Sequence, residues 1–133
     1  MRTAIDSSVL WSIFKGEGDA EAWVDLLIAC RRESRLLVCD VVIAEIAPLF
    51  KDSAALESRL GSLGVEFDPI LPGTAFLAGG LFNQHRRQGG RRDQLMPDFM
   101  IGAHAMIQAD RLAARDRGYL RRYFPGLSVL ALE

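Results

Sequence analysis

Four acidic side chains stand where carboxylates can be gathered into one site. Asp6 directly follows a short β-type run, and Asp116 comes just after a later one, in the segment LAARD. Asp98 lies in the first turn of an expected helix within MPDFMIGAHA, and Glu45 is the one acid of the apolar segment VVIAEIAPLF. Taken one at a time, Asp6 and Asp98 could each simply be residues that cap a helix. A turn or a solvent-exposed edge would explain the other two.

Taken together, the four carboxylates predict a metal site. An ionised Glu45 among apolar neighbours is costly to bury unless it finds a partner or reaches solvent. Carboxylates that converge on one point repel each other, and hard divalent cations such as Mg²⁺ or Mn²⁺ bind oxygen ligands in that arrangement. Such an ion activates a bound water and stabilises the charge that develops on a phosphodiester during hydrolysis.

The elements that must position these acids alternate along the chain. Apolar runs between glycine, proline and capping signals predict strands over residues 3–5, 35–39, 65–68, 111–114 and 127–132. The intervening segments predict helices over residues 7–14, 19–32, 41–50, 53–63, 74–87, 97–108 and 118–123, with Asp40 capping the third. This order indicates an α/β protein with a mainly parallel sheet that helices cover on both faces. Ligands of such sheets bind at the carboxyl ends of the strands, where Asp6 and Asp116 should meet.

The charges of the chain are strongly segregated. A formal net charge of −1 argues at first sight against a nucleic-acid binder. However, residues 1–85 carry seven basic and twelve acidic side chains, whereas residues 86–122 carry nine arginines and only four acids. Of the 16 basic residues 14 are arginine, whose planar guanidinium binds phosphate or carboxylate with two parallel hydrogen bonds. The arginine-rich segment is therefore a candidate phosphate-binding surface; a solvated helix face is the alternative.

Length and composition describe an ordinary globular domain. With 133 residues, 50% hydrophobic and 25% charged, the chain is neither disordered nor collagenous, and we expect one domain over residues 1–133. Cys30 and Cys39 do not form a C-x-x-C motif, and two histidines are too few for a typical structural zinc site with them. No apolar stretch is long enough for a signal peptide or a membrane span, which predicts a cytoplasmic protein without membrane contact.

Four segments in order resemble the PIN domain family, and more narrowly the VapC-type toxin ribonucleases of toxin–antitoxin pairs. They are AIDSSVLWSIF, VVIAEI, LMPDFMIGAHA and LAARDRGYLRRYFPGLSVL, and together they span essentially the whole chain. The resemblance implies a three-layer α/β/α sandwich with a mainly parallel sheet of about five strands. It also implies an endoribonuclease that depends on Mg²⁺ or Mn²⁺ and that a cognate antitoxin inhibits.

The resemblance also implies roles for individual residues. Asp6, Glu45, Asp98 and Asp116 fall on the family's acidic quartet, as catalytic residues and metal ligands. Asp6 and Asp98 would be the most direct ligands, and Ser7 falls where the family often has a hydroxyl beside the first acid. Ala114, in contrast, stands where the family commonly has threonine or serine.

Further residues are expected at the surfaces that contact RNA and the antitoxin. The RNA backbone, of a tRNA or an rRNA, would be held by Arg86, Arg87, Arg91, Arg92, Arg115 and Arg117. The alternative is that some of these arginines pair with acids of the same chain. The antitoxin would cover an apolar groove that includes Trp11, Phe14, Leu49 and Phe50, although ordinary core packing explains each of these equally well. A homodimer is also usual in the family.

Two other functions remain open from the sequence. A non-catalytic module of the same fold would bind RNA or protein without cleaving it. A phosphoryl-transfer domain of the receiver or phosphatase type also places acids at strand ends. The second reading is disfavoured because Ser7 and Ser8 follow Asp6, where a second acid would be expected, and because neither Lys15 nor Lys51 follows a late strand.

Overall fold

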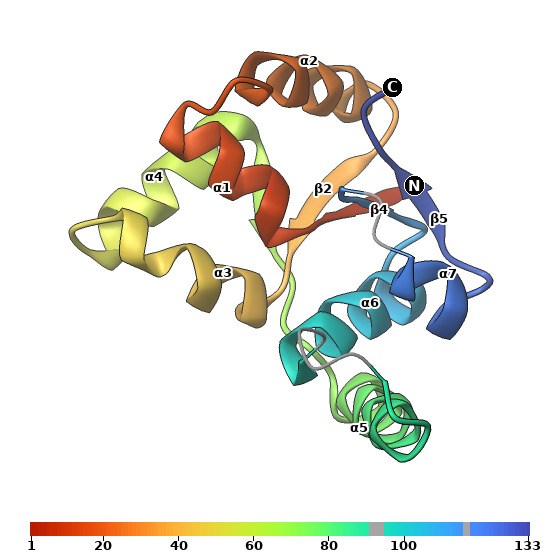
Figure 1. Cartoon of the computed structure of the whole chain (residues 1–133). Helices are drawn as coiled ribbons and strands as arrows, with labels where there is room; N and C mark the ends of the chain where they lie inside the picture. Colours follow the sequence, from red (N-terminus) through yellow and green to blue (C-terminus); the bar gives the residue numbers. More distant parts are fainter. Residues whose placement is uncertain (91–94, 116–117) are drawn as a thin grey trace.

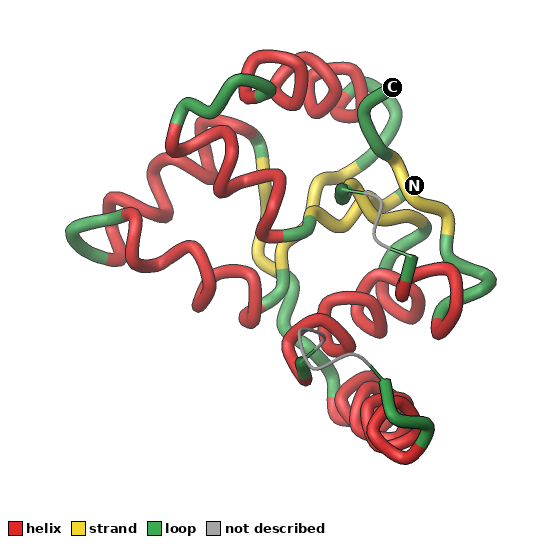
Figure 2. Tube along the Cα trace, viewed as in Figure 1, coloured by secondary structure: helices red, strands yellow, loops and turns green. Residues whose placement is uncertain are grey.

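The computed structural model describes residues 1–90, 95–115 and 118–133. Over these residues the chain forms a single sheet of five parallel strands with helices on both sides (Figures 1 and 2). In chain order the elements are β1 (Arg2–Ile5), α1 (Ser7–Lys15), α2 (Ala20–Arg31), β2 (Arg35–Val38), α3 (Asp40–Ile46), the 3₁₀ turn η1 (Ala47–Leu49), α4 (Ser53–Leu63), β3 (Val65–Phe67), α5 (Pro72–Arg87), α6 (Met96–Gln108), β4 (Arg111–Ala113), α7 (Tyr119–Tyr123) and β5 (Ser128–Leu130).

The strands lie in the order β3-β2-β1-β4-β5. Connections between parallel strands are right-handed, so the chain places α1 to α4 on one face while it moves from β1 to β3. It then returns across the sheet through α5 and α6 to β4, which places these helices and α7 on the other face (Figure 1). The expected three-layer α/β/α sandwich with a parallel sheet is confirmed.

The direction of winding reverses between β1 and β4. These two strands are neighbours, with Ala4 opposite Leu112 and Ile5 opposite Ala113. In an open parallel sheet such a reversal leaves a crevice at the carboxyl ends of the two strands, and this is where ligands bind. The segments that follow Ile5 and Ala113 are therefore the expected ligand-binding region of this fold.

Burial explains why these short strands form. Leu36, Leu37 and Val38 of β2 are all buried, as expected for a central strand with helices on both faces. Val9 and Leu10 of α1 pack on one face with α2, while large aromatic side chains of α6 and α7 fill the other face. No helix among the described residues has the length and apolar character needed to cross a membrane.

The predicted boundaries are mostly correct within two residues, and the exceptions have local causes. Asp40 is the first residue of α3 rather than its N-cap, a position taken by Cys39. The same helix ends at Ile46 and continues as a 3₁₀ turn that contains Pro48, because proline cannot donate the next helical hydrogen bond. Helix α5 begins two residues earlier than predicted, at Pro72, whose fixed φ suits a first helical position.

Candidate active site

Asp6 joins the end of β1 to the start of α1. Its carboxylate caps α1 by accepting hydrogen bonds from the backbone N–H and the hydroxyl of Ser8. Its own N–H donates to the carbonyl of Ala113 at 2.9 Å, which fixes it beside the end of β4. The residue is only 1% exposed. Asp6 thus lies at the carboxyl end of β1, as the sequence predicted, and the strand order places it where the winding reverses.

Glu45 reaches the same region from α3. It is the last residue but one of that helix, and its Oε1 accepts a hydrogen bond of 2.9 Å from the Ser7 hydroxyl. This bond joins the first turn of α1 to α3 and holds the Glu45 carboxylate toward the end of β1. The hydroxyl expected beside the first acid therefore contacts the second acid.

Asp98 enters from α6. It follows Pro97 in the first helical turn, and its Oδ2 accepts a 2.9 Å hydrogen bond from the N–H of Leu95. The Leu95 carbonyl accepts the N–H of Asp98 in return, also at 2.9 Å. This reciprocal pair holds the carboxylate at a helix N-terminus, where the helix dipole favours negative charge.

These elements enclose an open pocket of about 210 Å³. Its walls are formed by Ser7, Ser8, Trp11, Glu45 and Asp98. The structure thus brings two of the four predicted acids into one pocket, and Ser8 connects that pocket to Asp6, the third. Asp116, the fourth, lies outside the described residues.

The side chains of this pocket suit a hard cation. Carboxylate and hydroxyl oxygens are the ligands that Mg²⁺ and Mn²⁺ prefer, and a cation would relieve the repulsion between two carboxylates in one pocket. Within the part of the chain that the structure describes, no three Asp, Glu, His or Cys side chains are gathered closely enough to hold an ion. The metal site therefore stays a prediction.

The arginines predicted to bind RNA have different surroundings. Arg86 and Arg87 are exposed at the end of α5, and the guanidinium of Arg86 lies 5.9 Å from the ring centre of Phe82. Arg115 forms an ion pair of 2.8 Å with Asp19 of the α1–α2 loop. Arg91, Arg92 and Arg117 lie outside the described residues.

The residues predicted for the antitoxin groove lie on the α1–α3 side. Phe14 and Phe50 are half-buried and pack edge to face, with 5.1 Å between ring centres. Leu49 is half-buried next to Phe50, and Trp11 forms a wall of the acidic pocket. Their contact with a partner stays a prediction.

Asp19 binds three side chains, an arrangement that the sequence did not predict. Its carboxylate accepts hydrogen bonds from the Ser12 hydroxyl and from the Trp23 indole N–H, besides pairing with Arg115. The hydrogen bond from Ser12 holds the pKa of Asp19 below its ordinary value. The hydrogen bond from Trp23 and the charge of Arg115 lower the pKa in the same direction. The only signal in the sequence was its place before a helix, where a cap is the usual explanation.

The parallel fold and the acidic pocket at its winding reversal define a class of α/β proteins with a carboxylate-lined site. Within that class, the sequence model of the PIN domain matches residues 3–125 of the chain. The chain therefore belongs to the PIN domain family, as its motifs predicted. A comparison with curated proteins gives no significant match.

Solved structures share this fold over nearly the whole chain. VapBC2 from Rickettsia felis, bound to a DNA fragment from their promoter, matches with a TM-score of 0.77 and 16% identity over 100% of both chains. FitAcB from Neisseria gonorrhoeae matches with a TM-score of 0.63 and 17% identity, over 96% of this chain and 95% of that one. DNA-bound VapBC from Salmonella typhimurium gives 0.62 and 18%, over 98% of each.

Proposed function

We propose that this PIN domain is the toxin of a type II toxin–antitoxin pair and acts as an endoribonuclease that depends on Mg²⁺ or Mn²⁺. The observation that supports the reaction is the pocket that Glu45 and Asp98 share at the carboxyl edge of the sheet, next to Asp6. The arginine-rich second part of the chain supports a polyanionic substrate. Its RNA would be a tRNA or an rRNA.

In this proposal the four acids have different roles in the reaction. Asp6 and Asp98 would bind the cation directly, and Glu45 and Asp116 would complete the site and orient the attacking water. A bound divalent cation would supply a water of lowered pKa and positive charge opposite the reacting phosphate. Ser7 would hold Glu45 through their 2.9 Å hydrogen bond, so that its carboxylate stays turned toward this site.

The reaction is tested with purified protein, total RNA and added Mg²⁺ or Mn²⁺. Asp98→Asn removes the charge but keeps an oxygen that can accept the Leu95 N–H, and Glu45→Gln keeps an acceptor for Ser7. Each should lower the cleavage rate by about 100-fold or more, the range seen when one charge-stabilising group is lost. Glu57→Gln, at an exposed position on α4, is the matched control and should leave the rate unchanged.

Two results would refute the enzymatic assignment. Full activity of Asp98→Asn and Glu45→Gln would mean that the pocket does not carry the reaction. RNA binding without cleavage, together with calorimetry that shows no uptake of divalent ions, would identify a non-catalytic binding module. Sequencing the RNA ends formed in cells after induction would identify the target.

An antitoxin is the expected partner, as the solved VapBC structures suggest. We infer that it covers Trp11, Phe14, Leu49 and Phe50, because Phe14 and Phe50 keep exposed surface while packing on each other. Phe50→Ala should weaken inhibition by a small protein encoded beside this chain, whereas Phe76→Ala, an exposed phenylalanine on α5, should not. Equal effects of the two variants would place the antitoxin elsewhere. The proposal includes a homodimer, which light scattering would detect.

A further inference from the structure

Helix α5 lies at the edge of the molecule, with α6 as its main neighbour (Figure 1). Its inward face carries Thr74, Ala78 and His85, which are all buried. Its outward face carries Phe76, which is 86% exposed and is the most exposed large apolar residue in the described part of the chain. A phenylalanine in this position gains burial only if another molecule covers it.

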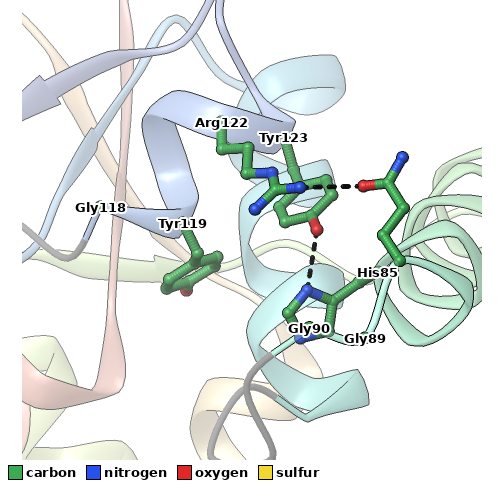
Figure 3. Close-up of a pocket in the computed structure, with 8 residues that line it drawn as sticks. His85, Gly89, Gly90, Gly118, Tyr119, Arg122 and Tyr123 are labelled. Carbon is green, nitrogen blue, oxygen red and sulfur yellow. Dashed lines mark hydrogen bonds between the residues drawn. The ribbon is translucent and has the colours of Figure 1, made fainter.

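The inward face holds α5 in a fixed position. Nδ1 of His85 lies 2.8 Å from the Tyr123 hydroxyl, and Arg122 donates a 3.0 Å hydrogen bond to Oε1 of Gln88, just past the end of the helix (Figure 3). These contacts join the end of α5 to α7. The outward face is therefore a preformed surface, and binding to it requires little ordering of the helix.

The exposed residues of α5 repeat with the spacing of a helix–helix contact. Intervals of three, four, three and four residues separate the exposed positions Gly73, Phe76, Gly80, Asn83 and Arg87. Two helices that pack side by side use this spacing. A Cβ atom at Gly73 or Gly80 would meet no atom of the described residues within 4 Å, so the backbone is bare on both sides of the Phe76 ring.

This face carries no charge over most of its length. The 17 residues between Asp68 and Arg86 include no Asp, Glu, Lys or Arg, although charged residues make up 25% of the chain. In a two-fold symmetric dimer, a charged group near the axis would face its own copy and be repelled. An uncharged face avoids this repulsion, whereas a nucleic acid would require basic groups there. The charge pattern therefore favours a second copy of this chain.

We propose that α5 is the dimer interface of this chain, with two copies of the helix packed antiparallel about a two-fold axis close to Ala78. Phe76 then packs on the partner's Gly80, and the partner's Phe76 packs on Gly80 in return. This direction keeps the arginines at the ends of the two helices apart. It brings each arginine pair toward the start of the partner's helix, next to Asp68, whose side chain is 29% exposed.

This inference rests on the homodimer that the proposed function includes, and it assigns the surface that forms it. One helix of 16 residues offers a strip about 24 Å long and 10 Å wide, which buries far less than the about 1,600 Å² of a standard interface. The dimer is therefore weak and reversible. At about 1 μM the monomer prevails with Phe76 in solvent, so urea unfolding at this concentration does not depend on the contact.

Sedimentation velocity of the intact chain from about 1 to about 500 μM measures the self-association. The wild type should change from monomer to dimer over this range. Phe76→Lys places two like charges near the axis and should weaken the dimer about tenfold or more. Ile28→Lys adds the same charge at a 46% exposed residue of α2, on the other face of the sheet, and should behave as wild type. Equal association of the two variants would overturn the proposal.

An exchange of ring and glycine tests the register. Phe76→Gly removes the ring, and Gly80→Phe places a second ring where the partner's Phe76 is expected, so each should weaken the dimer about tenfold or more. The double variant again sets one ring against one glycine and should recover most of the affinity. If its loss equals the product of the two single losses, the two positions do not meet and the register is refuted.

The outcomes separate this inference from the proposed function. A wild-type chain that stays monomeric at the highest concentration refutes the interface and the homodimer, while the cleavage assay with Asp98→Asn still tests the ribonuclease. A dimer that Phe76→Lys leaves intact refutes only the interface on α5. If Phe76→Lys loses binding of the antitoxin encoded beside this chain but still self-associates, the face receives the antitoxin instead, and the proposal is overturned.

Discussion

Replacement of Phe99 by alanine should destabilise the protein more than any surface change. Phe99 is fully buried in α6, directly after Asp98. Its ring packs against five aromatic side chains, at 5.2 to 6.4 Å between ring centres: Phe82, His85, Tyr119, Tyr123 and Phe124. These neighbours come from α5, from α7 and from the residue after α7, so one ring joins three segments of the helical layer on this face of the sheet.

The magnitude follows from burial and from the size of the chain. Truncation of a buried phenylalanine to alanine costs about 3–5 kcal/mol of unfolding free energy. A chain of 133 residues has about 7–20 kcal/mol in total, at about 0.05–0.15 kcal/mol per residue. With a urea dependence of about 2 kcal/mol per molar, a loss of about 4 kcal/mol lowers the unfolding midpoint by about 2 M.

Urea titration followed by far-UV circular dichroism measures this shift. Phe76→Ala is the matched control, because Phe76 lies on the adjacent α5 but is 86% exposed. It should change stability by less than about 0.5 kcal/mol. If both variants shift the midpoint equally, the aromatic cluster around Phe99 does not hold α5 and α7 to α6.

Three other positions give expectations for reactivity, pH dependence and packing. Burial raises the pKa of the Cys39 thiol to about 11, so iodoacetamide at pH 8 should label it slowly in the native protein and rapidly in denaturant, as mass spectrometry would show. Because the pKa of Asp19 is lowered in the folded chain, chiefly by Ser12, its stabilising effect is present above its ordinary value of 3.8 and is lost as pH falls. Asp19→Asn should therefore have a lower melting temperature than wild type at pH 7, and the two melting temperatures should converge in acid. Gly102→Ala would place a Cβ 2.4 Å from the Phe124 ring and should cost about 1–3 kcal/mol in urea unfolding.

The fold was largely predictable because its signals are local. Continuous apolar runs such as 36–38 mark strands that are buried on both faces, and their alternation with helices leaves a parallel sheet as the usual solution. The order β3-β2-β1-β4-β5 is not local, since it depends on which crossover spans the sheet. Pro48 is a local signal too: proline limits or kinks the helix predicted over residues 41–50, and α3 does end at Ile46, before the 3₁₀ turn that contains Pro48.

The candidate site was predictable only where sequence position implies a place in space. Asp6 could be placed from the strand before it, and Asp98 from the proline that starts its helix. The partner of Arg115 could not be predicted, because Asp19 lies 96 residues away in the sequence and the two side chains meet only in the folded chain. The contact between His85 and Tyr123 was not predictable for the same reason: the two residues are 38 positions apart, and each alone suggests ordinary packing.

Helix α6 connects the acidic pocket to the aromatic cluster through two successive residues, Asp98 and Phe99. Successive residues of an α-helix point about 100° apart. Asp98 therefore faces the acidic pocket while Phe99 faces the aromatic cluster that fills this side of the core. The net charge of −1 sums acid-rich residues 1–85, arginine-rich residues 86–122 and the acidic Glu133. In the proposed ribonuclease, the substrate that reaches the N-terminus of α6 would meet carboxylates suited to a cation at its reacting phosphate.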